Sequence, residues 1–252
     1  MNPEVFRDAS SSCSSFFEKL IDPNSSTLLE VTVEKNTVLH VALQFKKFVA
    51  VENIVNLNPS LVYEKNSKGN TPLHVAARVG DSSMVKLLID QAKDQLDVET
   101  GGRQQLLSMM NEDGDTALHV AVRYGNFDVV KELINENDPA ELAMQINKAG
   151  ESALFLAVDS QDDKIASHIL SAAPDCSYAG RDGMNVLHAL VLRTSCCKCY
   201  SILLLKYFCI VRDILAHYNR HKFYFTLCAN QVSYLYLKVI TLEFCLLYIL
   251  IL

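Results

Sequence analysis

Four histidines that recur at regular intervals are the residues of this sequence most suggestive of chemistry. They are His40, His74, His119 and His188. Imidazole nitrogen is a common zinc ligand, so this recurrence raises the question of a metal site. Each histidine lies in a similar heptapeptide, and we expect copies about 33 residues apart to lie on successive packed units, roughly 10 Å apart. Zinc needs its ligands about 2 Å from one ion, so the spacing argues against a metal site.

A structural role fits these histidines better. We expect each imidazole to bond the side chain three residues earlier, a threonine in the first three copies, and a carbonyl of a neighbouring turn. In the fourth copy Phe155 stands in the histidine position and Ser152 in the threonine position. That copy is therefore predicted to lose the polar link between turns and to depend on apolar packing.

Other combinations of reactive residues are weaker. Cys196, Cys197 and Cys199 precede the pair His217 and His221, but the cysteines lack the spacing of a zinc finger and no second cluster follows. The acidic pair at 162–163 falls between two helices and is more typical of a solvated surface. The sequence contains no nucleophile elbow, no zinc-protease motif, no P-loop and no dinucleotide-binding glycine motif. We therefore predict no catalytic residue, no metal and no cofactor, and an enzyme is a distant alternative.

Composition divides the chain into two chemically different segments. The 252 residues carry a net charge of −6 and are 50% hydrophobic, which suits a packed core and disfavours a general nucleic-acid binder. Residues 1–194 hold 27 of the 29 acidic groups, whereas residues 195–252 are basic and hold six of the eight cysteines. The few cysteines before residue 195 favour a reducing compartment, and no secretory signal begins the sequence. We expect residues 1–194 to be cytoplasmic.

An internal repeat determines the predicted fold. Its five copies are residues 36–42, 70–76, 115–121, 151–157 and 184–190, and steps of 34, 45, 36 and 33 residues separate their leucines. The second copy reads Thr71-Pro72-Leu73-His74-Val75-Ala76 and the others keep most of these positions, a pattern that resembles the ankyrin repeat. The resemblance implies units of a turn and two helices that bury their apolar faces only by stacking.

The residues around each copy agree with this assignment. Gly69, Gly114, Gly150 and Gly183 stand where a tight turn needs positive φ. The residue that follows each turn can cap a helix, and Pro72 suits a first helical turn. Gly80 and Gly125 suit left-handed helix ends.

We predict an all-α ankyrin-repeat solenoid of about five helix-turn-helix units. Residues 1–35 form a degenerate N-terminal cap or, alternatively, a partly disordered arm. The repeats occupy residues 36–194, with an insertion near 90–105 whose charge and paired glycines favour an exposed loop. Residues 195–252 form a hydrophobic tail rich in cysteine and tyrosine.

The leading function is protein binding on the concave face of the solenoid, where turn tips and the ends of first helices are exposed. Arg123 and Tyr124 are the pair to test first, since arginine and tyrosine are common interface anchors. We expect their joint replacement to weaken binding without lowering the melting temperature. Each candidate could equally be an ordinary solvated side chain. The candidate binding residues are Lys68, Asn70, Arg78, Asp113, Asp115, Arg123, Tyr124, Lys148, Asp159 and Arg181.

The tail has two interpretations. Residues 223–252 contain only Lys238 and Glu243 as charged groups, but the longest uncharged run, 223–237, is shorter than the roughly twenty residues that cross a bilayer. A marginal membrane anchor is one interpretation, with Arg220 and Lys222 on the cytoplasmic side. The other is a non-native product of translation into an intron rich in A and U.

Residues 1–194 also resemble plant ankyrin-repeat membrane proteins of the accelerated-cell-death type. The resemblance rests on Met1-x-Pro3-Glu4, on Asn36-Thr37-Val38-Leu39-His40 and on the 36-residue step containing Pro139. It implies a role in defence or cell-death signalling at the plasma membrane. The family's Pro-Gly-Gly domain with several membrane helices has no counterpart in this sequence.

Overall fold

The structure is a computed structural model that describes residues 1–3, 6–7, 9, 29–94, 102–134, 139–186 and 188–189. The chain divides into two compact units, Met1–Tyr200 and Ser201–Leu252. All described residues belong to the first unit. The sequence-based expectations for the tail at 195–252, and for residues 10–28 of the N-terminal cap or arm, lie outside the described residues.

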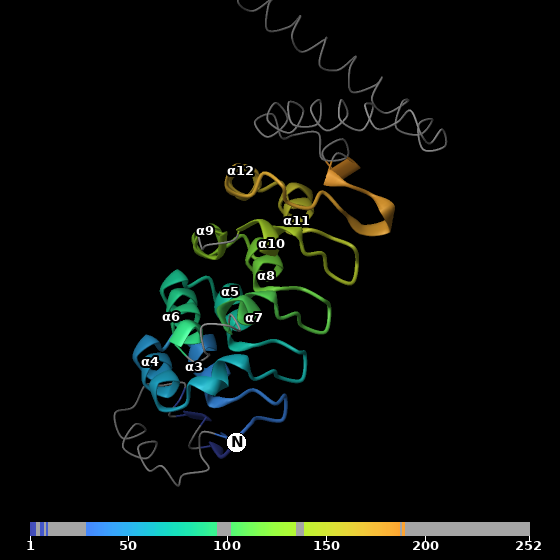
Figure 1. The fold of residues 1–252 in the computed structure, drawn as a ribbon. Helices are drawn as coiled ribbons and strands as arrows, with labels where there is room; N and C mark the ends of the chain where they lie inside the picture. Colours follow the sequence, from blue (N-terminus) through green and yellow to red (C-terminus); the bar gives the residue numbers. More distant parts are fainter. Residues whose placement is uncertain are drawn as a thin grey trace, which may run out of the picture. The chain divides into compact units, whose positions relative to one another are not determined.

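The described chain is a row of four helix pairs (Figure 1), each an inner helix followed by an outer helix. The inner helices are α3 (Val38–Gln44), α5 (Pro72–Val79), α8 (Ala117–Arg123) and α11 (Ala153–Asp159). The outer helices are α4 (Phe48–Leu57), α6 (Ser82–Asp94), α9 (Phe127–Ile134) and α12 (Asp163–Ala172). Shorter elements are η2 (Pro59–Tyr63), α7 (Gly102–Ser108), α10 (Pro139–Met144) and η3 (Arg181–Gly183). Of the fifth copy, 184–190, the structure describes 184–186 and 188–189, with helical residues at 186 and 188–189.

The helices stack in the order of the sequence. Inner helices pack on inner helices, α3 on α5, α5 on α8 and α8 on α11, and outer helices do the same. The inner helices are therefore buried nearly all round: six consecutive residues of α5, Pro72–Ala77, are buried. The outer helices bury only one stripe, such as Val129, Val130, Leu133 and Ile134 of α9. A continuous apolar core, shared by neighbouring units, holds the described repeats together, as the sequence predicts.

The inner helices begin where the sequence places their caps. Thr37, Thr71 and Thr116 each form a reciprocal capping box with the histidine three residues later. Ser152 caps α11 by accepting a hydrogen bond from the backbone N–H of Phe155. Pro72 stands at the first position of α5, where its missing N–H leaves no bond unmade.

Between the helix pairs, the turns stack closely enough for their backbones to hydrogen-bond. The N–H of Glu112 donates to the carbonyl of Lys68 at 3.0 Å, and the N–H of Lys148 donates to the carbonyl of Asp113 at 3.0 Å. Gly114 has φ +75°, and a Cβ there would lie 2.6 Å from the nitrogen of Lys148. Glycine is therefore required at Gly114 for its backbone angle and for the close approach of the next turn. Three isolated antiparallel bridges lie at the bases of these turns, and the described residues contain no strand.

The segment expected as an exposed loop near 90–105 is helical at both ends. Helix α6 continues to Asp94, and α7 runs from Gly102 to Ser108. Leu106 and Leu107 of α7 are buried, and the hydroxyl of Tyr63 donates to the carbonyl of Gly102 at 3.2 Å. The expectation of a loop missed this helix because the glycines and charges of the insertion masked its short apolar pair. Within the described residues, no helix has the length and apolar character to cross a membrane.

Candidate functional site

Three of the four recurring histidines link successive turns in the way the sequence predicts. The Nδ1 of His40, His74 and His119 lies 2.8 Å from the hydroxyl of the threonine three residues earlier. The Nε2 atoms reach the next turn, at the carbonyls of Asn70 (3.0 Å), Asp115 (2.9 Å) and Glu151 (3.1 Å). Because a carbonyl only accepts, Nε2 carries the proton and the threonine hydroxyl donates to Nδ1. These imidazoles are structural bridges between repeats.

Burial keeps these imidazoles neutral. Loss of hydration lowers the pKa of His40 to about 4 and that of His74 to about 4, against the opposing pull of the carbonyl each bonds. The pKa of His119 is also lowered by burial, with Asp115 acting in the opposite direction. The described residues include no group of three or more histidine, cysteine, aspartate or glutamate side chains placed to hold a metal ion.

The fourth repeat replaces this polar bridge by an apolar contact, as predicted. Phe155 is fully buried in the histidine position. Its ring lies against Gly180 of the next turn, where an added Cβ would approach within 2.2 Å of a ring carbon. Gly180 therefore provides the space that the larger ring needs.

Like the histidines, a second set of side chains connects neighbouring turns by hydrogen bonds. We call this set the asparagine ladder, and its asparagines are Asn36, Asn66, Asn70, Asn111 and Asn147. The side-chain amide of Asn66 donates to Oδ1 of Asn36 at 2.8 Å, and that of Asn111 to Oδ1 of Asn70 at 3.0 Å. The side-chain oxygen of each donating asparagine also accepts two backbone N–H groups of its own turn, for Asn111 those of Asp113 and Asp115 at 2.9 Å. The sequence-based predictions did not include this ladder. A signal for it exists, because Asn66, Asn111 and Asn147 each stand four residues before the residue that precedes a helix cap.

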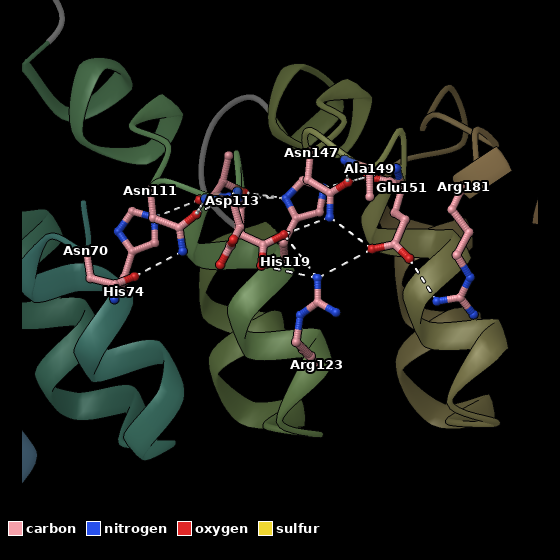
Figure 2. Close-up of polar contacts among 12 residues, drawn as sticks. Asn70, His74, Asn111, Asp113, His119, Arg123, Asn147, Ala149, Glu151 and Arg181 are labelled. Atoms are coloured by element: carbon pink, nitrogen blue, oxygen red, sulfur yellow. Dashed lines mark hydrogen bonds and ion pairs between the residues drawn. The ribbon is translucent and has the colours of Figure 1, made fainter. Parts of the chain in front are cut away.

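In the third bond of the ladder, a carboxylate replaces the accepting asparagine (Figure 2). The amide of Asn147 donates to Oδ1 of Asp115 at 2.8 Å and to Oε2 of Glu151 at 3.0 Å. Both carboxylates are buried, at 4% exposure each. Arg123 lies between them, with Nη2 at 3.2 Å from Asp115 Oδ2 and 3.4 Å from Glu151 Oε2. Arg123 and the amide of Asn147 thus each contact both of these carboxylates, which water reaches poorly, and compensate part of their charge.

Arg181 ends the series. Position 180 is a glycine and supplies no amide to Glu151, but Arg181 Nη1 donates to Glu151 Oε1 at 3.0 Å. Its Nη2 donates to Asp159 Oδ2 at 2.5 Å, and this hydrogen bond to Asp159 is the main cause that raises the pKa of Arg181. Asp159 and Arg181, two of the predicted binding residues, are therefore partners of each other.

A groove of about 750 Å³ lies along α5 and α8 and the turns beside them. Its aliphatic lining is Val75, Val120 and Ala149. Glu112 and Glu151 also line it, as do Asn111 and Asn147 of the ladder. Eight of the ten predicted binding residues line this groove, namely Lys68, Asn70, Arg78, Asp113, Asp115, Arg123, Tyr124 and Lys148.

The groove residues differ in what they can offer a partner. Lys68, Asp113, Tyr124 and Lys148 are exposed, with Tyr124 at 56%. Asp115 is a correction to the sequence-based prediction, because its carboxylate is buried and occupied by Arg123 and Asn147. The expectation for Arg123 changes as well. Its replacement would uncover two buried carboxylates and lower the melting temperature, so Arg123 positions the groove wall in addition to lining it.

Comparison with known proteins agrees with this geometry. The family model for ankyrin repeats (3 copies) matches residues 7–101 and 96–182. A search of curated proteins finds no match. Ankyrin repeats are generally interaction domains without enzymatic activity, and they generally bind protein partners. The matches, the turn-helix-helix units and the buried histidine bridges together lead to one assignment: this chain belongs to the ankyrin-repeat family.

Proposed function

We propose that this chain is a protein-binding scaffold and that its partner occupies the groove along α5 and α8. The observation that supports this proposal is that the residues lining the groove fall into two groups, one buried and hydrogen-bonded and the other exposed. Asp115, Asn147 and Glu151 are buried and mutually hydrogen-bonded. Tyr124 and Lys148 line the same groove and are exposed. Because the buried residues are already held in place by hydrogen bonds, the groove loses little conformational entropy when a partner binds, and this favours binding.

Binding in this proposal requires no chemical step. Tyr124 offers an aromatic ring for apolar contact and a hydroxyl for a hydrogen bond, and Val75 and Val120 provide an apolar floor. The lysines at the rim assist the encounter with a partner through longer-range attraction.

The experiment uses the full chain as bait in extract of its native cells, followed by affinity measurement with the purified partner. Tyr124→Ala is expected to weaken binding about tenfold, since a central aromatic anchor often contributes more than 1 kcal/mol. Phe48→Ala is the matched control, because Phe48 is an exposed aromatic residue on the outer helix α4. If both variants bind as tightly as the wild type, the partner does not use this groove.

We further propose, from the sequence resemblance alone, that the scaffold acts in plant defence or cell-death signalling. Hypersensitive cell death in plants that express or lack the chain is the readout. An unaltered response in both lines would contradict this role.

The alternative proposal is a membrane-anchored signalling protein held by residues 223–252, with the repeats in the cytoplasm. Its support is the low charge of this stretch, which contains two charged groups in thirty residues. Membrane association that resists carbonate and high salt, and that disappears when residues 223–252 are deleted, is the expected result. Association that salt removes would contradict an anchor.

A further inference from the structure

Arg78 and Arg123 occupy the same position of successive repeats, five residues after the leucine of each copy. The corresponding residues are Gln44 in the first repeat and Asp159 in the fourth. Arg123 is neutralised by Asp115 and Glu151, and Asp159 by Arg181. Arg78 lines the groove, and its side chain makes no hydrogen bond or ion pair with the described part of the chain.

The cause of this difference lies in two neighbouring positions. Arg123 meets a carboxylate from its own turn, Asp115, and another from the next turn, Glu151. The residue of Arg78's own turn is Asn70, which is neutral and already bonded to Asn111. The residue of the following turn is Asp115, whose oxygens are engaged by Arg123 and Asn147. Arg78 therefore places in the groove a half-buried side chain whose guanidinium has no partner among the described residues.

The surroundings of Arg78 favour a single carboxylate over a polyanion. Lys68 also lines the groove and adds a second cation without a described partner. The tip residues Glu112 and Asp113 place two carboxylates along the same groove. A phosphodiester backbone would meet these acids, whereas one carboxylate in a mainly uncharged segment would not.

We propose that Arg78, with Lys68, is a carboxylate-binding subsite that receives an aspartate or glutamate of the partner, presented on an extended segment that lies in the groove. This proposal rests on the proposed protein-binding function and gives it a chemical specificity. The planar guanidinium donates two parallel hydrogen bonds to a carboxylate, which gives orientation as well as attraction. Val75 and Val120 receive an apolar neighbour of the acidic residue.

The test is a random library of twelve-residue linear peptides selected on the full chain, with Arg78→Gln as the variant. Lys86→Gln is the matched control, because it removes one positive charge from the exposed face of α6 in the same repeat. Peptides selected on the wild type are expected to be enriched in Asp or Glu at one position. Arg78→Gln is expected to bind them about tenfold more weakly, and Lys86→Gln equally well. Arg78→Glu is expected to select Lys or Arg at that position.

Three outcomes would overturn the subsite. They are peptides without acidic enrichment, acidic peptides that Arg78→Gln and the wild type bind equally, and a library from which the wild type selects nothing. The Tyr124→Ala measurement with the native partner decides the proposed function separately, since it requires neither a linear peptide nor a carboxylate. Peptides lost in Tyr124→Ala but retained in Arg78→Gln would leave groove binding intact and exclude the carboxylate subsite.

Discussion

The side-chain amide of Asn147 donates a 2.8 Å hydrogen bond to Oδ1 of Asp115, in the turn of the preceding repeat. The same amide nitrogen lies 3.0 Å from Oε2 of Glu151 in its own turn. This bond is the charged version of a contact that two neutral asparagine pairs make in the repeats before it. The residues of this contact, Asp115, Asn147 and Glu151, also line the groove. The stability of the repeats and the shape of the groove therefore depend on the same side chains.

Removal of a ladder asparagine is expected to destabilise the fold. Asn111→Ala loses the bond to Asn70 and the two bonds that its carbonyl oxygen accepts within the turn. At about 1 kcal/mol for each bond, the free energy of unfolding should fall by roughly 2–4 kcal/mol in urea titrations. Asn56→Ala, at an exposed site on α4 where the side chain accepts one long hydrogen bond from Gln91 (3.4 Å), is the control and should change it by less than about 1 kcal/mol. Equal effects at both sites would mean that the ladder is energetically unimportant.

Arg123 and Arg78 are expected to differ in stability although both line the groove. Arg123→Gln leaves the buried carboxylates of Asp115 and Glu151 with less compensation, and should lower the free energy of unfolding by about 2–3 kcal/mol. Arg78→Gln should leave the melting temperature nearly unchanged.

Addition of Asp115→Asn to Arg123→Gln should recover part of the loss, because one of the uncovered charges is then absent and the amide oxygen can still accept the hydrogen bond from Asn147. Calorimetric unfolding of the three variants is the measurement. A double variant no more stable than Arg123→Gln alone would show that the loss is not electrostatic.

Stability is expected to fall with acid through the histidine bridges. The pKa of His40 and of His74 is about 4 in the folded chain, lower than the ordinary value of 6.5. The unfolded chain therefore binds more protons between these values. The stabilisation from each neutral imidazole is complete above pH 6.5 and is lost as pH falls toward 4. Between pH 7.5 and 5 the loss should be about 2 kcal/mol for each histidine.

Urea unfolding at half-unit pH intervals measures this slope. His74→Gln should be less stable than the wild type at neutral pH and should show a smaller decrease toward pH 5. An unchanged slope in this variant would mean that His74 does not contribute to the acid sensitivity.

Gly180 is expected to tolerate no side chain while Phe155 is present. An added Cβ would lie 2.2 Å from the ring, so Gly180→Ala should destabilise the chain by about 1–3 kcal/mol through overpacking. Phe155→Leu in the same chain should relieve part of that cost. Thermal unfolding of both single variants and the double variant gives the coupling between the sites. Additive effects would show that the two residues do not compete for the same space.

Much of the fold was predictable from sequence because its determinants are local. Thr71 and His74 are three residues apart, so their capping box follows from helix geometry alone. The turn glycines were identified because positive φ is a property of single residues, and Gly114 has φ +75°. The same register led to the bonds of the histidines to the next turn, since repetition places each copy on its neighbour.

The sequence by itself determined the repeat, its caps, the histidine bridges and the list of residues near the turn tips. Only the tertiary structure decided which of these residues are exposed and unpaired, and so able to contact a partner. Asp115 and Asp113 look equivalent in the sequence, but Asp115 is buried because Asn147, 32 residues later, bonds it. Arg78 and Arg123 look equivalent too, and they differ because a carboxylate stands beside one and an amide beside the other. Such pairings depend on residues far apart in the chain, and packing of successive repeats is what brings them together.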